Sequence, residues 1–154
     1  MKPVYVAAVA LMVALVLVGC ASAPEAAPEP EPAPAEEADR TIRISAHDQM
    51  RFDPEGVRVQ AGQTVRFVVK NVVRVQHSFT LGTPQSQERH EAEMQGMAPD
   101  RMASHMEENP MGIVVQPGET DTLTWRFEDG GAVEFACHIP GHFVAGMTGR
   151  IRVN

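Results

Sequence analysis

The chain has 154 residues and a formal net charge of −7 at neutral pH. Because this length allows one domain with a single core, we expect one folded unit with short flanking segments. Many of the acidic residues fall within residues 21–39, and the rest of the chain carries no basic stripe. The composition therefore argues against a nucleic-acid-binding protein, and the acidity by itself identifies no partner.

The first 19 residues have the pattern of an export signal. Lys2 is followed by an apolar run from Val4 to Val18, which is shorter than the roughly 20 residues that a membrane-spanning helix needs. The run leads into the letters LVGC, which resemble a bacterial lipobox. We therefore expect residues 1–19 to be a lipoprotein signal peptide and Cys20 to carry the lipid. Because no aspartate follows Cys20, the outer membrane is favoured over the inner membrane.

Residues 20–40 are rich in alanine, proline and glutamate and contain almost nothing that could form a core. Proline keeps such a segment extended at about 3.1 Å per residue, so it predicts a tether that holds a domain about 60 Å from a membrane. We therefore expect a periplasmic, lipid-anchored protein whose folded domain covers residues 41–154.

The domain shows hydrophobic alternation with a period of two, which is typical of half-buried strands. Turn signals such as Pro117-Gly118 and Gly130-Gly131 separate the alternating runs. This pattern predicts an all-β fold, a Greek-key antiparallel β-sandwich. The expected strands cover residues 41–45, 57–60, 64–69, 77–81, 113–115, 122–127, 133–137 and 149–153.

Residues 83–112 interrupt the alternation with a polar, methionine-rich insert that we expect to be partly helical. A helix that begins at Pro84 would place one histidine and two methionines on one face, and a second short helix would do the same. Thioethers favour Cu(I), so the insert is a candidate accessory Cu(I) site. The alternative is that the methionines only pack the helices against the sandwich. The candidate donors are His90, Met94, Met97, Met102, His105 and Met106.

The stretch FACHIPGHFVAGMTG places Cys137, His142 and Met147 at equal spacing, with glycines that can turn the chain between them. If Cys20 carries lipid, Cys137 has no disulfide partner within the chain. A thiolate, a thioether and two imidazoles suit copper in electron transfer, and His77 is available as the second imidazole. The alternatives are buried structural residues, a cysteine nucleophile, or zinc, which more often takes four strong ligands.

Two segments together resemble the cupredoxin family of type 1 copper proteins: FDPEGVRVQAGQTVRFVVKN followed by His77, and CHIPGHFVAGMTGRIRV. The resemblance covers the chain from about residue 41 to 154 and is greatest to the periplasmic copper-tolerance cupredoxins of the CopI type. It implies a copper ion with the weak axial ligand Met147 and the equatorial ligands His77, Cys137 and His142. It also implies that Asn71 braces the ligand loop through hydrogen bonds. The chain departs from the expected family pattern at Ser78, where we expect an acidic residue.

His138 follows Cys137 directly. Because adjacent residues of a strand point to opposite faces, we expect His138 to face away from the metal, in a structural or surface position. Multicopper oxidases use histidines beside such a cysteine to reach further copper ions, but the sequence carries no His-x-His pairs. We therefore expect no enzyme activity.

These observations predict a periplasmic type 1 copper protein that acts in copper tolerance by binding copper and handling its redox state. The alternative is a single-copper electron shuttle between membrane redox complexes. The expected partners are copper ions, a redox protein and, through the lipid, a membrane.

Overall fold

The structure is a computed structural model that describes residues 37–98, 101, 104–106, 108–128 and 131–154. The predicted signal peptide (1–19), Cys20 and most of the predicted tether (20–40) lie outside these residues, as does Met102. Among the residues that are described, no helix is long and apolar enough to cross a membrane.

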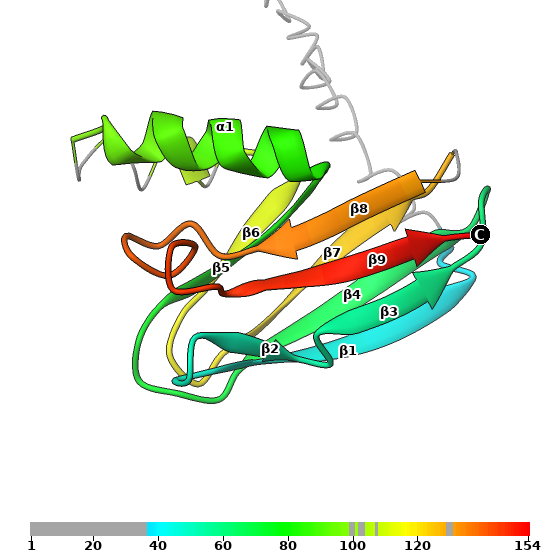
Figure 1. Ribbon diagram of the computed structural model, residues 1–154. Helices are drawn as coiled ribbons and strands as arrows, with labels where there is room; N and C mark the ends of the chain where they lie inside the picture. The colour runs from blue at the N-terminus through cyan, green and yellow to red at the C-terminus, as the bar shows by residue number, and fades with distance from the viewer. Residues whose placement is uncertain (1–36, 99–100, 102–103, 107, 129–130) are drawn as a thin grey trace, which may run out of the picture. The chain divides into compact units, whose positions relative to one another are not determined.

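Two β-sheets form the domain (Figure 1). The first has the strand order β2-β1-β4-β7, with β1 (Arg40–His47), β2 (Arg51–Asp53), β4 (Thr64–Asn71) and β7 (Thr120–Arg126). The second has the order β3-β9-β8-β5-β6, with β3 (Gly56–Val59), β5 (His77–Gly82), β6 (Gly112–Val115), β8 (Gly131–Ala136) and β9 (Thr148–Val153). The prediction of an all-β sandwich is confirmed, and every expected strand is present.

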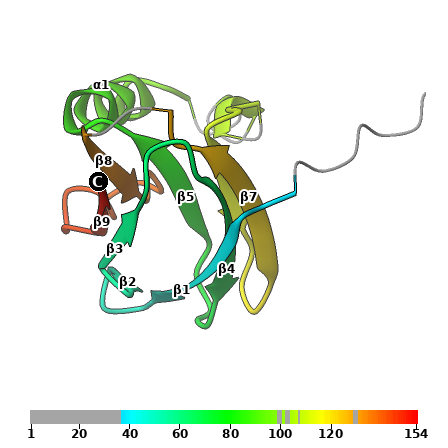
Figure 2. The ribbon, with the colours of Figure 1, turned by 90° about the vertical axis from the view of Figure 1, so that its right-hand side faces the viewer.

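One hydrophobic core joins the two sheets, which face each other around it in Figure 2. The ring of Phe79 on β5 lies at its centre, with centroids 5.7 Å from Phe52, 5.4 Å from Phe67 and 5.1 Å from Phe135. Such buried rings supply much apolar area and favourable edge contacts. Because Phe67 belongs to the first sheet and Phe135 to the second, this cluster fixes β5 and β8 against the opposite layer. The ends of β5 and β8 carry the histidine and the cysteine predicted to bind metal.

The two sheets are mixed, whereas the sequence predicted antiparallel strands. β1 pairs with β4, and β3 pairs with β9, in parallel registers. The chain passes through β3 in the second sheet before β4 returns to the first, so β4 runs in the same direction as β1. The short strand β2 was not predicted, because three residues are too few to show alternation.

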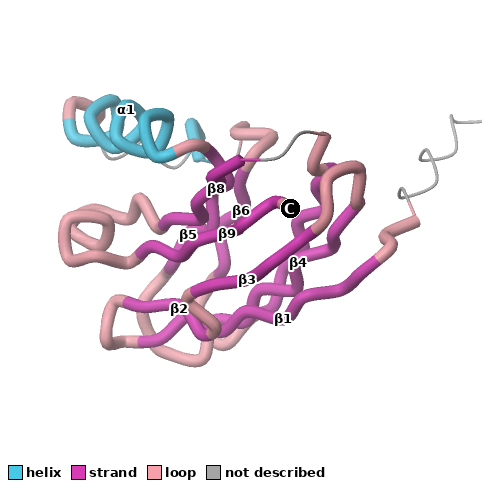
Figure 3. The backbone as a smooth tube through the Cα atoms, turned by 45° about the vertical axis from the view of Figure 1, so that its right-hand side comes forward, coloured by secondary structure: helices cyan, strands magenta, loops and turns pink. Residues whose placement is uncertain are grey.

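Helix α1 (Pro84–Gln95) covers β5 and β8 on the face that points away from the core (Figures 1 and 3). This cover explains why β5 is buried at every position. The helix begins after Thr83, whose hydroxyl accepts a hydrogen bond from the Ser86 N–H, and it ends at Gly96. Residues 104–106, further along the insert, are also helical.

The face of α1 that is buried against the sandwich consists of Gln87, Glu91 and Met94. The sequence predicted a face formed by His90, Met94 and Met97, and this grouping is wrong because Met97 lies beyond the end of the helix. Two of the three buried side chains are polar, so a search for apolar periodicity could not identify the face. Their burial depends on a partner in the sandwich, described below.

Candidate metal centre

Three predicted ligands meet in one buried cluster. The Sγ atom of Cys137 lies 3.7 Å from Nδ1 of His77 and 3.3 Å from Nδ1 of His142. Relative exposures are 0% for His77 and Cys137 and 9% for His142. Ligand atoms of all three residues lie within 4.8 Å of one another, so one ion placed among them is within reach of each.

The loop from Cys137 to Met147 is closed by its own backbone. The N–H of Cys137 donates to the carbonyl of Met147 at 3.1 Å, and the N–H of Met147 donates to the carbonyl of His142 at 3.0 Å. Gly141 and Gly146 turn the chain with φ values of 87° and 91°, a region that favours glycine. Met147 is fully buried at the end of this loop. The equal spacing of the three residues in the sequence therefore corresponds to a loop whose end returns to its beginning.

Asn71, at the end of β4, braces the segment that leads into His77. Its side-chain amide donates to the carbonyls of Val75 at 2.6 Å and Val115 at 3.0 Å. Its side-chain oxygen accepts from the N–H of Val73 at 3.0 Å. Because Asn71 is fully buried, these three bonds satisfy groups that water cannot reach. The loop before His77 is thereby fixed to the neighbouring strand β6.

Ser78 occupies the position where the sequence departs from the expected family pattern. Its N–H lies 3.3 Å from the Cys137 Sγ and its hydroxyl 3.8 Å from the same atom. The hydroxyl also accepts from the N–H of His138 at 2.8 Å. A buried carboxylate at this point would repel a thiolate, whereas Ser78 offers it hydrogens. Sequence reasoning noted the departure but missed this role.

Burial sets the protonation of the metal-free cluster. It lowers the pKa of His77 to about 4, with a further contribution from His142, and it also lowers the pKa of His142. Burial raises the pKa of the Cys137 thiol, although hydrogen bonds from Ser78 oppose this effect. At neutral pH the imidazoles are therefore free to donate to a metal, and the thiol must lose its proton when a metal binds.

The donor set fits copper. Both imidazoles turn Nδ1 toward the sulfur. A thiolate with two imidazoles and a nearby thioether is the set of type 1 copper sites. Zinc, in contrast, takes four strong ligands in closed structural sites, and the fourth group here is the thioether of Met147.

Comparison with known proteins agrees with this chemistry. The family described as copper binding proteins, plastocyanin/azurin family, matches residues 39–154. The chain belongs to this family. Its cofactor is copper, and His77, Cys137 and His142 are the residues placed to hold it.

Curated relatives and solved structures support the assignment. A copper-resistant cuproprotein CopI from Rubrivivax gelatinosus is 43% identical, over 82% of this chain and 73% of that protein. A CopI protein from Pseudomonas aeruginosa is 36% identical, over 77% of this chain and 78% of that protein. The predicted resemblance to CopI-type cupredoxins is confirmed.

Two solved structures share the fold. Auracyanin from Roseiflexus castenholzii is 24% identical with a TM-score of 0.64, over 77% of this chain and 99% of that chain. Auracyanin A, a blue copper protein from Chloroflexus aurantiacus, is 26% identical with a TM-score of 0.61, over 74% of this chain and 98% of that chain.

His138 is buried between the copper centre and α1, so of the two predicted positions the structural one is correct. Its Nδ1 lies 2.9 Å from the Glu91 carboxylate, and its Nε2 lies 2.8 Å from the side-chain oxygen of Gln87. Gln87 presents its oxygen because its amide nitrogen already donates to the carbonyls of Thr80 and Glu134. Nε2 therefore carries a hydrogen, which it donates to the Gln87 oxygen.

This network links the insert to the cysteine that binds copper. Sequence reasoning missed Gln87 and Glu91, whose charge and polarity suggested exposure. Both are buried because a single imidazole satisfies them. The only available signal was the i, i+4 spacing of the two residues, which is too common to identify a partner.

The candidate accessory donors fall into two groups. Met94 and Met106 are buried at 2% and 7% exposure, as packing predicts. Met94 lines a hollow with His138 beside the ligand loop. His90 and His105 instead stack on each other with ring centroids 5.3 Å apart and line a separate hollow. The histidines are thus brought together, while Met94 points elsewhere.

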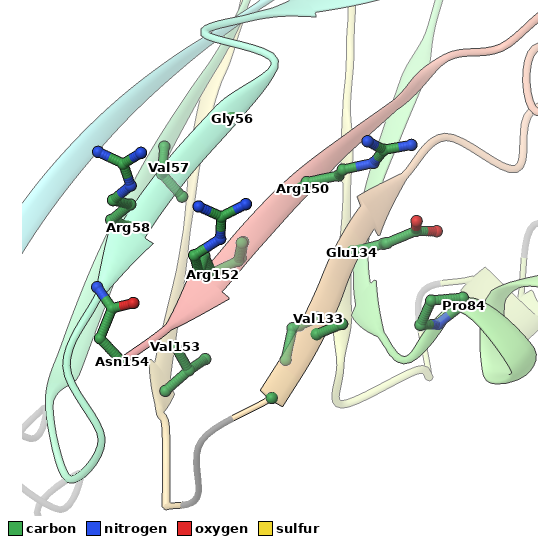
Figure 4. A pocket seen from close by; sticks show the side chains of 13 residues that line it. Gly56, Val57, Arg58, Pro84, Val133, Glu134, Arg150, Arg152, Val153 and Asn154 are labelled. Carbon is green, nitrogen blue, oxygen red and sulfur yellow. The ribbon is translucent and has the colours of Figure 1, made fainter.

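A third hollow, of about 920 Å³, lies along β3, β8 and β9 (Figure 4). Arg58, Arg150 and Arg152 extend from β3 and β9, and Glu134 on β8 lies beside Arg150, its partner in the strand register. None of the copper ligands lines this hollow. It is an exposed sheet face, not part of the metal centre.

Proposed function

We propose that this protein binds copper through His77, Cys137 and His142, with Met147 as a weak axial ligand. It acts in copper tolerance in the periplasm, where it binds copper and handles it in both redox states. The observation that carries the proposal is the buried cluster of two imidazoles and one thiol. The two CopI relatives are named copper-resistant cuproproteins, which supports the role in copper tolerance.

Bound copper supplies one-electron chemistry. The residues around it supply a fixed and dry set of donors. The ligand loop is closed by backbone hydrogen bonds, and Asn71 fixes the other ligand segment, so neither depends on the charge of an ion. The burial of all three side chains excludes water from the thiolate, which protects it from oxidation and side reactions.

The alternative function is electron transfer to a redox protein, and one observation favours it. The large hydrophobic side chains that are exposed within the described part of the chain are Val72, Val75 and Val144, at 44%, 45% and 73%. The first two lie in the segment before His77, and the third lies beside His142. Exposed apolar groups near ligands are suited to docking a partner.

A copper-sensitivity assay tests the proposal against this alternative. A strain that lacks the gene is complemented with wild type, Cys137→Ser, or the double variant Val75→Ser/Val144→Ser. Copper tolerance by metal handling requires that Cys137→Ser fails and that the double variant succeeds. Equal growth in copper for the wild type and Cys137→Ser would refute the proposal. Failure of the double variant alone would favour a role that needs a docked redox partner.

The periplasmic, lipid-anchored location is part of the proposal. It rests on the LVGC motif at Cys20 and on the Ala/Pro/Glu-rich segment 20–40. Cys20→Ala should remove the mature protein from the membrane fraction, leaving either soluble material or an uncleaved precursor, without changing copper binding by the domain. Mass spectrometry of the wild type should show an acylated Cys20 at the amino terminus. A soluble wild-type protein that begins beyond Cys20 would contradict the anchor.

A further inference from the structure

A second group of metal-ligating side chains lies in the insert, outside the copper centre. Ligand atoms of His90, Glu93 and His105 all lie within 4.8 Å of one another. His90 and Glu93 are three residues apart on α1 and so share one side of the helix. His105 comes from the helical residues 104–106 and stacks on His90 at 5.3 Å.

The cluster borders a hollow of about 400 Å³ whose floor is formed by Thr80 and Leu81 of β5. Glu93 is exposed, while His90 and His105 are half-buried. An ion could therefore enter from solvent past the carboxylate and reach the imidazoles. This access differs from that of the copper centre, where all three donors are buried.

His90 carries the strongest sign of a ligand-binding site. Its Nε2 is buried and has no hydrogen-bond partner in the described part of the chain. A buried polar atom without a partner costs free energy, so such atoms are rare in folded proteins. The ring is held from two sides, by His105 and by His138, whose centroid lies 4.5 Å away.

Protonation also leaves His90 able to donate. Burial lowers its pKa, and the neighbouring His138 and His105 lower it further, although Glu93 and Glu91 oppose them. The imidazole is therefore neutral at physiological pH, which is the form that binds metals.

We propose that His90, Glu93 and His105 form a second metal site that binds a divalent transition metal, with Cu²⁺ as the tightest-binding ion. Two imidazole nitrogens and one carboxylate oxygen are borderline and hard donors, which suit Cu²⁺ and Zn²⁺ better than Cu⁺. Cu²⁺ leads the divalent first-row metals in affinity for such donors. The thioether of Met94 takes no part in it, since it faces the ligand loop. This second metal site does not require that the protein act in copper tolerance.

Metal stoichiometry of the full-length protein tests this site. The wild type and variants are titrated with Cu²⁺ and desalted, and bound copper is measured by elemental analysis. The electron paramagnetic resonance spectrum then separates a type 1 signal from a second signal without thiolate character. We expect two equivalents in the wild type. His90→Ala/His105→Ala should hold one equivalent and keep the visible band of the copper centre.

Matched substitutions control for folding and for weak surface binding. Glu93→Gln and Glu88→Gln each remove one exposed carboxylate from the same helix, but only Glu93 belongs to the cluster. Glu93→Gln should lower the affinity for the second equivalent of Cu²⁺ by at least about tenfold. Substitution of residues that only hydrogen-bond to metal ligands already lowers metal affinity by this factor. Glu88→Gln should leave it unchanged. His47→Ala is the matching control for loss of one imidazole.

Three results would overturn the site. The first is a wild type that binds one equivalent of Cu²⁺, and the second is a His90→Ala/His105→Ala variant that still binds two equivalents tightly. The third is an equal loss of affinity for the second equivalent in Glu93→Gln and Glu88→Gln. Circular dichroism checks that each variant keeps its strands. The copper centre is read separately from its visible band, so failure of the proposed function leaves this test intact.

Discussion

The copper centre and the histidine cluster of the insert differ in burial and in the segments that hold their ligands. The ligands of the copper centre are buried and lie on segments closed by backbone and Asn71 hydrogen bonds. The cluster of the insert is half-exposed and comes from one helix and a short helical segment. A fixed, dry site suits an ion that changes charge in place, whereas an open site suits an ion that exchanges with solvent.

The two regions meet at His138. This residue follows the copper ligand Cys137 and is held by Gln87 and Glu91 of α1, and its ring contacts that of His90. The insert is therefore connected by hydrogen bonds to the residue next to a copper ligand. Substitutions in the network test how far the two regions depend on each other.

The largest expected effect is at Cys137. Cys137→Ser should abolish the intense visible band of the copper-loaded protein, because that band arises from the thiolate bound to Cu²⁺. Absorption spectroscopy after addition of one equivalent of Cu²⁺ measures it. Met147→Leu is the matched control and should keep the band while raising the reduction potential. A wild type that stays colourless with bound Cu²⁺ would exclude a type 1 centre.

The second prediction concerns the contact between His138 and Glu91, which connects the two regions. Glu91→Ala leaves Nδ1 of the buried His138 without its partner, and a buried polar atom left unsatisfied in this way costs about 1–3 kcal/mol. Urea unfolding of the metal-free protein measures the loss. Glu88→Ala on the exposed side of the same helix should change stability by less than about 0.5 kcal/mol. Equal stability of the two variants would show that the contact between His138 and Glu91 does not stabilise the fold.

The third prediction is a pH dependence that both regions share. Burial lowers the pKa of His77 to about 4 and lowers the pKa of His142, His90 and His138 from 6.5. Between pH 6.5 and about 4 the unfolded chain therefore binds protons that the folded chain does not. The free energy of unfolding of the metal-free protein should be highest above pH 6.5 and should fall as the pH is lowered through this range.

Urea titrations at several pH values measure this slope. His90→Asn should reduce it, since one of the four groups is removed. A flat profile between pH 7 and 5 would contradict the burial of these imidazoles.

The smallest effect is expected at the methionines of the insert. Met94→Leu/Met106→Leu conserves volume at two buried positions and should cost under about 1.5 kcal/mol for each substitution. If the methionines only pack, the number of Cu⁺ equivalents bound without oxygen should also stay the same. A competition assay with a Cu⁺ chelator measures that number. Loss of one Cu⁺ equivalent would instead restore the thioether site that the sequence suggested.

The sequence by itself determined the strands and the ligand loop. Both are local patterns: alternation with period two follows from the geometry of one strand, and the spacing of Cys137, His142 and Met147 lies within one loop with glycine turns. The far segment with His77 was joined to it through the expected sandwich and the resemblance to cupredoxins, because no local pattern connects two residues that are 60 positions apart.

Only the tertiary structure decided which polar side chains are buried and which groups meet. Gln87 and Glu91 resemble surface residues until His138 is placed against them, and Glu93 joins His90 and His105 only because the insert folds back on α1. The parallel pairs depended likewise on the path of the chain between sheets. Such pairings follow from packing between distant segments, where the free energy of a polar group depends on the partner that it finds.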